Sequence, residues 1–164
     1  MLQPNFDTLQ GSAVLVTGGA GFIGTPLVER LVELGAKVTV CSRFPKMVRA
    51  RLPSSVVVIE DLLRLNPAGY DLVVNLAGAP IMDERWSEKR KAELLSSRVE
   101  TTELLHEHLS NLKRFPRALV SGSAIGFYGD TKDQAVTEQA DAGSGFAADL
   151  CRQWEAAATR FARE

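Results

Sequence analysis

The sequence predicts an α/β protein built on a doubly wound, parallel β-sheet. Five short apolar segments alternate with stretches of helical periodicity along the 164 residues. The first four segments are almost uninterrupted in apolar residues, which is typical of parallel strands covered on both faces. The predicted strands are residues 13–17, 37–41, 56–59, 71–75 and 117–121. A glycine-rich turn directly after the first strand supports this class of fold, because such turns lead from a strand into a helix.

Four helical segments are predicted at residues 22–34, 45–51, 87–112 and 145–162. In the first, apolar residues return every three or four positions, Pro26 falls in the first turn, and Gly35 follows the end. In the third, Ser87 is a suitable N-cap, and a break is expected near Ser96 and Ser97. The polar segment that follows the fifth strand, residues 129–144, is predicted to be a loop.

The third helical segment combines an apolar stripe with a charged run. The stripe consists of Leu94, Leu95, Val99, Thr102, Leu105, Leu109 and Leu112, and it predicts either core packing or a dimer face. The run 88–91 is interpreted as a solvated face. Arg98 lies close to the stripe, where it would either reach a phosphate of a ligand or form a structural ion pair.

Composition and charge exclude several classes of function. The net charge of −1 gives no support to a nucleic-acid partner. No apolar stretch could span a bilayer, and the first residues lack the charged and apolar regions of a signal peptide, so we expect a cytoplasmic protein without a membrane partner. Cys41 and Cys151 are isolated, which favours a reducing compartment. His106 and His108 point to different helix faces, so no metal site is expected.

The organisation of the chain indicates one domain over residues 1–164, with residues 1–12 as an N-terminal extension. A further strand is expected after the last helical segment, and none is present. We therefore expect a fragment of a longer protein. The rest of that protein would hold the last strand or strands of the sheet and the C-terminal substrate domain.

Residues 17–24 read Thr-Gly-Gly-Ala-Gly-Phe-Ile-Gly and begin where the first strand ends. Gly18 permits a tight turn, Gly21 lets backbone N–H groups approach a phosphate, and Gly24 lets the following helix pack closely. The helix directs its positive end at the anion. The predicted pyrophosphate-binding residues are Gly18, Gly21, Phe22, Ile23 and Gly24. The alternative is a structural glycine turn without a ligand.

The second predicted strand ends without a carboxylate. A protein that prefers NAD usually places Asp or Glu there for the ribose 2′-hydroxyl, whereas here the strand leads into Ser42, Arg43 and Lys46. Arg43 and Lys46 are available for a 2′-phosphate, since a guanidinium can bind phosphate with two parallel hydrogen bonds. The sequence therefore predicts NADP(H), and the alternative is a solvated basic turn.

Two further segments complete the predicted cofactor site. Asp61 and Leu62 follow the third strand, where they would meet the adenine as acceptor and wall. Leu76, Ala77 and Gly78 follow the fourth strand, where small residues allow a ribose to approach the backbone.

Three motifs give the chain a family resemblance. Thr-Gly-x-x-Gly-x-x-Gly at 17–24, Asn-Leu-Ala-Gly at 75–78 and Ser-Gly-Ser-Ala at 121–124 resemble the extended and atypical short-chain dehydrogenase/reductase superfamily. This resemblance implies a Rossmann-type fold and identifies the chain as similar to the N-terminal, NADP(H)-binding portion of such proteins. It also implies a homodimer through helices 87–112 and 145–162.

More specific motifs narrow the resemblance to one subgroup. They are Arg-Trp at 85–86, Ser-x-Arg-x-x-Thr-Thr from residue 96, Ser-Ala-x-Gly-x-Tyr-Gly at 123–129 and Cys-x-x-Trp-Glu-x-Ala at 151–157. They resemble the epimerase-like subgroup labelled sugar-nucleotide epimerase or "cell division inhibitor". The resemblance extends from about residue 13 to residue 158.

The catalytic residues that this superfamily uses are only partly present. The resemblance implies that Ser123 holds a substrate carbonyl or hydroxyl. The superfamily's Tyr-x-x-x-Lys pair falls on Phe146 and Leu150, which carry neither a phenol nor an ammonium group. Tyr128 is a weaker candidate for a substitute acid.

Two functions follow from this combination. The first is an NADP(H)-dependent oxidoreductase or epimerase acting on a small-molecule substrate, with this fragment alone inactive. The second is a non-catalytic NADP(H)-binding regulatory protein, either a cell-division-linked sensor or a partner-binding module.

Overall fold

The computed structural model describes residues 9–163, so residues 1–8 of the expected N-terminal extension (1–12) lie outside the described part. The chain divides into two compact units. Unit 1 comprises residues 9–76 and 105–120, and unit 2 comprises residues 77–104 and 121–163. Within residues 9–163, no helix combines the length and hydropathy that a bilayer crossing requires.

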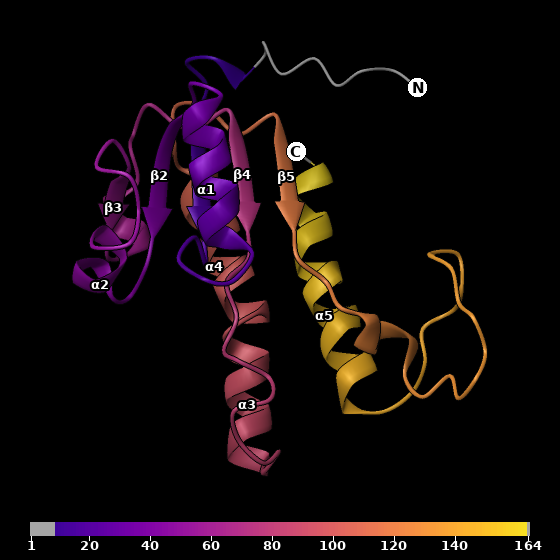
Figure 1. Cartoon of the computed structure of the whole chain (residues 1–164). Helices are drawn as coiled ribbons and strands as arrows, with labels where there is room; N and C mark the ends of the chain where they lie inside the picture. Colours follow the sequence, from indigo (N-terminus) through magenta and orange to yellow (C-terminus); the bar gives the residue numbers. More distant parts are fainter. Residues whose placement is uncertain (1–8, 164) are drawn as a thin grey trace. The chain divides into compact units, whose positions relative to one another are not determined.

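A five-stranded sheet organises unit 1. Its strands are β1 (Ala13–Thr17), β2 (Lys37–Cys41), β3 (Val57–Ile59), β4 (Leu72–Asn75) and β5 (Ala118–Ser121). The strand order is β3-β2-β1-β4-β5, and the arrows in Figure 1 point the same way. Thr17 lies opposite Cys41 on one side and Asn75 on the other, so the carboxyl ends of the three central strands are level. The predicted doubly wound parallel sheet is confirmed.

Helix α1 (Gly24–Glu33) packs on this sheet through one face. Val28 and Leu31 join Val14 and Val40 in the core, because the helical period brings them to the same side. The prediction that this helix begins at residue 22, with Phe22 and Ile23 on its apolar face, is wrong. Both precede the helix, and their exposed fractions are 98% and 64%.

Two short helical elements complete the edge of unit 1 beside β3. Helix α2 (Pro45–Arg49) begins with a proline, whose missing N–H costs nothing in the first turn. A 3₁₀ turn, η2 (Leu62–Arg64), follows β3. The second half of helix α4 (Val99–Ser110) also belongs to this unit and buries Leu105 and Leu109.

Unit 2 contains helix α3 (Glu88–Ser96), the first part of α4, and helix α5 (Phe146–Thr159). It also contains the 3₁₀ turns η3 (Ile125–Tyr128) and η4 (Arg160–Arg163). Ser87 caps α3 by accepting a hydrogen bond from the backbone N–H of Arg90, as predicted. The predicted break between α3 and α4 is present at Ser97 and Arg98.

One residue of the charged run 88–91 is not solvated. Arg90 is only 5% exposed and donates hydrogen bonds to the Glu93 carboxylate, at 2.7 Å, and to the Pro80 carbonyl. The prediction of a fully solvated face is therefore wrong at Arg90. Its charge is tolerated in the interior because a carboxylate and a backbone oxygen accept its N–H groups.

The predicted loop 129–144 is present, and its two ends meet. The N–H of Gly143 donates to the carbonyl of Phe127 at 2.9 Å. A Cβ on Gly143 would lie 2.7 Å from the backbone nitrogen of Gly129, which itself has a φ of 68°. Two glycines are needed here because the incoming and outgoing backbones touch. We call this contact the loop neck; the loop that it closes, residues 130–142, extends beside α5 (Figure 1).

Candidate functional site

The glycine turn of unit 1 has the geometry of a phosphate cradle. Gly18 adopts a φ of 67°, and the N–H of Gly21 closes the turn on the Gly18 carbonyl at 3.0 Å. A Cβ on Gly24 would lie 2.7 Å from the Cα of Gly19, so only glycine lets α1 begin this close to the strand. Gly21 is exposed, and a Cβ there would meet only the Gly18 carbonyl, at 3.3 Å.

At the start of α1 the N–H of Thr25 donates to the Gly21 carbonyl at 3.0 Å, and Pro26 has no N–H. Ile23 occupies the N-cap position, and no side chain forms a capping hydrogen bond there. The first N–H groups of a helix have no acceptor within the helix, and the helix dipole adds positive potential at this end. An uncapped start beside a glycine turn can therefore bind an anionic group.

Gly19 was not among the predicted site residues, yet it is equally constrained. A Cβ on this residue would lie 2.8 Å from a methyl group of Val40 and 3.3 Å from one of Val28. It therefore lets the turn lie directly on the core. In the sequence, this constraint could have been inferred from the two adjacent glycines, Gly18 and Gly19.

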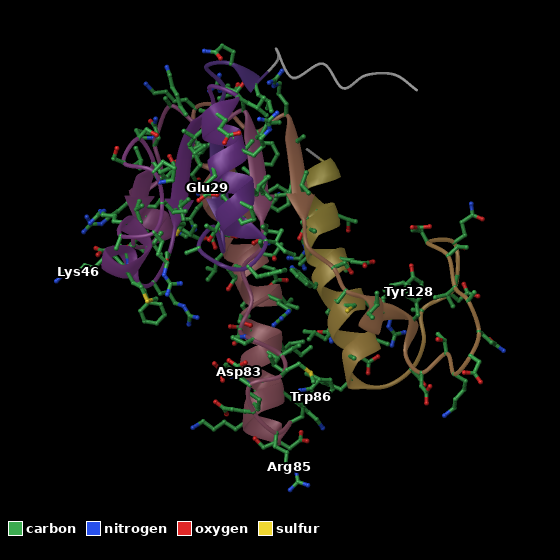
Figure 2. All side chains as sticks on the ribbon, in the orientation of Figure 1. Glu29, Lys46, Asp83, Arg85, Trp86 and Tyr128 are labelled. Atoms are coloured by element: carbon green, nitrogen blue, oxygen red, sulfur yellow. The ribbon has the colours of Figure 1, made fainter. Side chains whose placement is uncertain are left out.

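The carboxyl end of β2 presents two cations. Arg43 and Lys46 are exposed, and neither pairs with a carboxylate among residues 9–163. The Arg43 guanidinium lies 5.9 Å from the centre of the Phe44 ring. Lys46 projects outward from α2 (Figure 2). The Ser42 hydroxyl accepts from the N–H of Phe44 at 3.1 Å and so fixes the start of this basic turn.

Asp61 and Leu62 lie where β3 leads into η2. One carboxylate oxygen of Asp61 accepts from the N–H of Leu63 at 2.9 Å, which caps the turn. Leu62 is partly exposed. The predicted adenine contact remains a prediction.

Cys41, at the end of β2, is a weakly acidic thiol. Burial, together with the negative charge of Asp61, raises its pKa to about 11. At pH 8 such a thiol is ionised in about one molecule in a thousand, and only the thiolate reacts with alkylating agents. We expect iodoacetamide to label Cys41 far more slowly in the folded protein than in urea. Peptide mass mapping over time measures this, and equal rates in both states would contradict it.

The carboxyl ends of β1 and β4 are joined by buried side chains. The Thr17 hydroxyl donates to the Asn75 amide oxygen at 2.6 Å, and both residues are buried. The N–H of Leu76 then donates to the Thr17 carbonyl at 3.2 Å. This pair positions Leu76, the last predicted cofactor residue of unit 1, beside the glycine turn.

In unit 2, side chains from the end of α3 fix the segment after β4. The N–H of Ala79 donates to the Ser97 hydroxyl, and Arg98 donates to the Ala79 carbonyl, both at 3.0 Å. Ala77 is partly exposed and Gly78 is exposed. A Cβ on Gly78 would lie 2.9 Å from the guanidinium carbon of Arg98. The group that approaches Gly78 in this structure is therefore the end of an arginine side chain, and the predicted ribose contact remains a prediction.

The two candidate catalytic residues lie in different surroundings within unit 2. Ser123 is exposed and donates a hydrogen bond to the Glu155 carboxylate of α5. Tyr128 is half-buried at the end of η3, with its ring edge-on to Phe127 at 5.3 Å (Figure 2). The role of Glu155 as a partner of Ser123 was not predicted.

The positions at which the resemblance expects tyrosine and lysine are apolar. The Phe146 ring packs edge-on against Trp86, with 5.4 Å between ring centres, and the Lys91 ammonium lies 5.7 Å from its centre. Leu150 is 2% exposed and packs with Ala79 and Leu94. These side chains can pack but cannot exchange a proton.

Metal chemistry has no support in the described residues. Within residues 9–163 no group of three His, Cys, Asp or Glu side chains is arranged to hold a metal ion.

Comparisons with known proteins give the family. The sequence model of the NAD dependent epimerase/dehydratase family matches residues 14–149. The human epimerase family protein SDR39U1 is 34% identical over 148 residues, covering 88% of this chain and 48% of that protein. A chloroplastic SDR39U1 homolog from Arabidopsis thaliana is 34% identical over 154 residues, covering 90% and 44%.

Solved structures of similar proteins point to the same family. The crystal structure of human SDR39U1 (isoform 2) with NADPH has a TM-score of 0.74 at 34% identity, covering 89% of this chain and 48% of that one. A UDP-galactose 4-epimerase has a TM-score of 0.76 at 26% identity, covering 92% and 52%. The chain thus spans about half the length of the relatives that it matches. It belongs to the NAD dependent epimerase/dehydratase family.

Proposed function

We propose that this chain binds NADP(H), with the pyrophosphate at the glycine turn between β1 and α1. The observation that carries the proposal is the uncapped start of α1, held against the turn by Gly24. The solved structure of the human relative with NADPH supports the choice of ligand. Gly18, Gly21, Phe22 and Ile23 would line the phosphates, with the backbone N–H groups of Phe22 and Ile23 as donors.

The preference for NADP(H) over NAD(H) would come from the basic turn after β2. Arg43 and Lys46 are exposed and have no carboxylate partner in the described chain. A 2′-phosphate would accept from both, and Ser42 keeps the turn in place. Asp61 and Leu62 would meet the adenine, and Leu76, Ala77 and Gly78 would meet a ribose.

Replacing Arg43 by alanine is expected to weaken NADPH binding by about 10- to 100-fold, because a charge-assisted hydrogen bond contributes about 1.5–3 kcal/mol. NADH affinity should not change, because NADH has no 2′-phosphate. Calorimetric titration with both nucleotides measures the difference. Lys37→Ala, which removes an exposed cation at the opposite end of β2, is the matched control.

Two results would count against the proposal. If neither nucleotide binds, the glycine turn is structural only. If Arg43→Ala and Lys37→Ala weaken NADPH binding equally, the effect is general charge and not 2′-phosphate recognition.

For the whole protein we propose an epimerase or oxidoreductase reaction. Bound NADP(H) supplies or accepts a hydride at its nicotinamide ring. Ser123 would orient the substrate oxygen, and Tyr128 is the weaker candidate for moving a proton. Phe146 and Leu150 cannot do so, which leaves the acid/base group unassigned.

The apolar surroundings of Phe146 and Leu150 favour a second candidate, a non-catalytic NADP(H)-binding regulator. The names of the relatives given above refer to epimerases and not to cell division, so the regulated process is not specified. A panel of UDP-sugars with NADP⁺ and NADPH distinguishes the two. Steady turnover by the whole protein excludes the regulator, whereas tight NADPH binding without turnover counts against the enzyme.

A further inference from the structure

Arg98 in unit 2 carries a charge that no carboxylate balances. Its guanidinium donates to three neutral oxygens: the Ala79 carbonyl at 3.0 Å, and the Leu94 carbonyl and Ser97 hydroxyl at 3.3 Å each. No Asp or Glu in residues 9–163 pairs with it. Burial and the nearby charge of Arg90 lower the pKa of Arg98, while the Cys151 thiol acts in the opposite direction. A partly buried cation that touches only dipoles is incompletely stabilised.

A second group beside Arg98 lacks a hydrogen-bond acceptor. The Arg98 guanidinium lies 5.4 Å from the Trp154 ring centre, and Trp154 is only 7% exposed. The indole N–H of Trp154 is buried and has no acceptor among the residues that the structure describes. A buried donor without an acceptor costs about 1–3 kcal/mol. Buried donors in native proteins nearly always have a partner, and a bound water or ion is one group that can supply it.

The third member, Gly78, leaves this position accessible. Gly78 is exposed, and its missing Cβ is what brings the backbone to within contact of the guanidinium. Arg98 itself is partly exposed. A small anion can therefore approach the guanidinium without passing a side chain at position 78.

We propose that Arg98, Trp154 and Gly78, here called the Arg98 cluster, bind an oxyanion: the phosphate or carboxylate group of a ligand. A guanidinium has five N–H donors in a planar fork, and that of Arg98 engages three acceptors, two of them at the long distance of 3.3 Å. An oxyanion would balance the charge of Arg98 and offer an acceptor to the Trp154 N–H. All three residues belong to unit 2, and one of them, Gly78, is also among the residues proposed above to meet a cofactor ribose.

The test uses Trp154 as its own reporter. The sequence contains two tryptophans, so Trp86→Phe leaves Trp154 as the single emitter. Sodium phosphate, diphosphate and acetate are each titrated at constant ionic strength, with fluorescence and calorimetry as readouts. We expect saturable binding of at least one anion, and the better of phosphate and acetate identifies the class of oxyanion.

Three variants locate the site. Arg98→Met should weaken anion binding by at least 10-fold, because the charge and the fork are both lost. Arg98→Lys should recover part of the phosphate affinity and little of the acetate affinity, since a point charge cannot bind a carboxylate with two parallel bonds. Arg85→Met, at an exposed arginine of the same unit, is the matched control and should change nothing (Figure 2).

Trp154→Phe keeps the ring and removes only the N–H donor, so it remains informative if Arg98→Met does not fold. Calorimetry on this variant should show anion binding weakened by about 5- to 10-fold. The proposal is overturned if titration is not saturable in the wild type, or if the Trp154→Phe and Arg85→Met proteins bind as the wild type does. Arg43→Ala should leave these titrations unchanged, which separates this site from the proposed 2′-phosphate position.

Discussion

Replacing Leu150 by lysine is expected to lower the free energy of unfolding by about 3–5 kcal/mol, the cost of an uncompensated buried charge. Leu150 is 2% exposed and packs with Ala79 and Leu94, whose side chains offer no acceptor. The substitution restores the lysine that the superfamily resemblance expects at this position. Urea unfolding followed by circular dichroism measures the change.

The matched control for Leu150→Lys is Leu150→Met, which conserves volume and should cost less than about 1.5 kcal/mol. Phe146→Tyr should also be tolerated, since Phe146 is only partly buried at the start of α5. If Leu150→Lys is as stable as Leu150→Met, position 150 can accommodate an ammonium group.

Gly24→Ala is expected to destabilise the protein by about 3 kcal/mol and to abolish NADPH binding. The added Cβ would lie 2.7 Å from the Cα of Gly19, and a backbone atom cannot move aside as a flexible side chain can. Helix α1 would have to shift away from β1 and would carry its N–H groups off the proposed phosphate position. Thermal unfolding and NADPH calorimetry measure the two effects.

Gly21→Ala separates these effects. A Cβ at position 21 would meet only the Gly18 carbonyl, at 3.3 Å, and Gly21 is exposed, so stability should change by less than about 1 kcal/mol. NADPH affinity should nevertheless fall, because the methyl group would occupy space that the proposed phosphates need. If Gly21→Ala binds NADPH as the wild type does, the pyrophosphate does not lie over Gly21.

The strands could be predicted to within one residue because their signal is local. Each is a short apolar run bounded by a turn, and a buried parallel strand needs little else. The N-cap role of Ser87 and the left-handed conformation of Gly35 could be predicted equally well, because each is recognised from its immediate neighbours in the sequence.

The errors arose where a distant contact decides the outcome. Arg90 is buried because the Pro80 carbonyl, ten residues earlier, accepts one of its N–H groups. Phe22 and Ile23 fit a helical period, but the tight packing of Gly24 makes the helix begin after them. The spacing of apolar residues predicts neither the burial of Arg90 nor the later start of the helix.

The glycines and cations of the candidate site could be predicted from the sequence, whereas the hydrogen bonds between its side chains could not. Thr17 and Asn75 are 58 residues apart, and Ser123 and Glu155 are 32 apart, so nothing local indicates either hydrogen bond. The adenine contacts, the role of Tyr128 and a homodimer through helices 87–112 and 145–162 stay predictions. A sedimentation measurement that gives only monomer would remove the last of these.

The loop neck has a consequence for how this part of the chain can change. Because the Gly143 N–H and the Phe127 carbonyl hold the two ends together, we expect a change of length between residues 130 and 142 to leave η3 and α5 in place. Closing a longer loop on a fixed neck adds little conformational entropy cost. The segment can therefore gain, lose or exchange residues during evolution, and it is the natural place to insert an epitope or a spectroscopic tag.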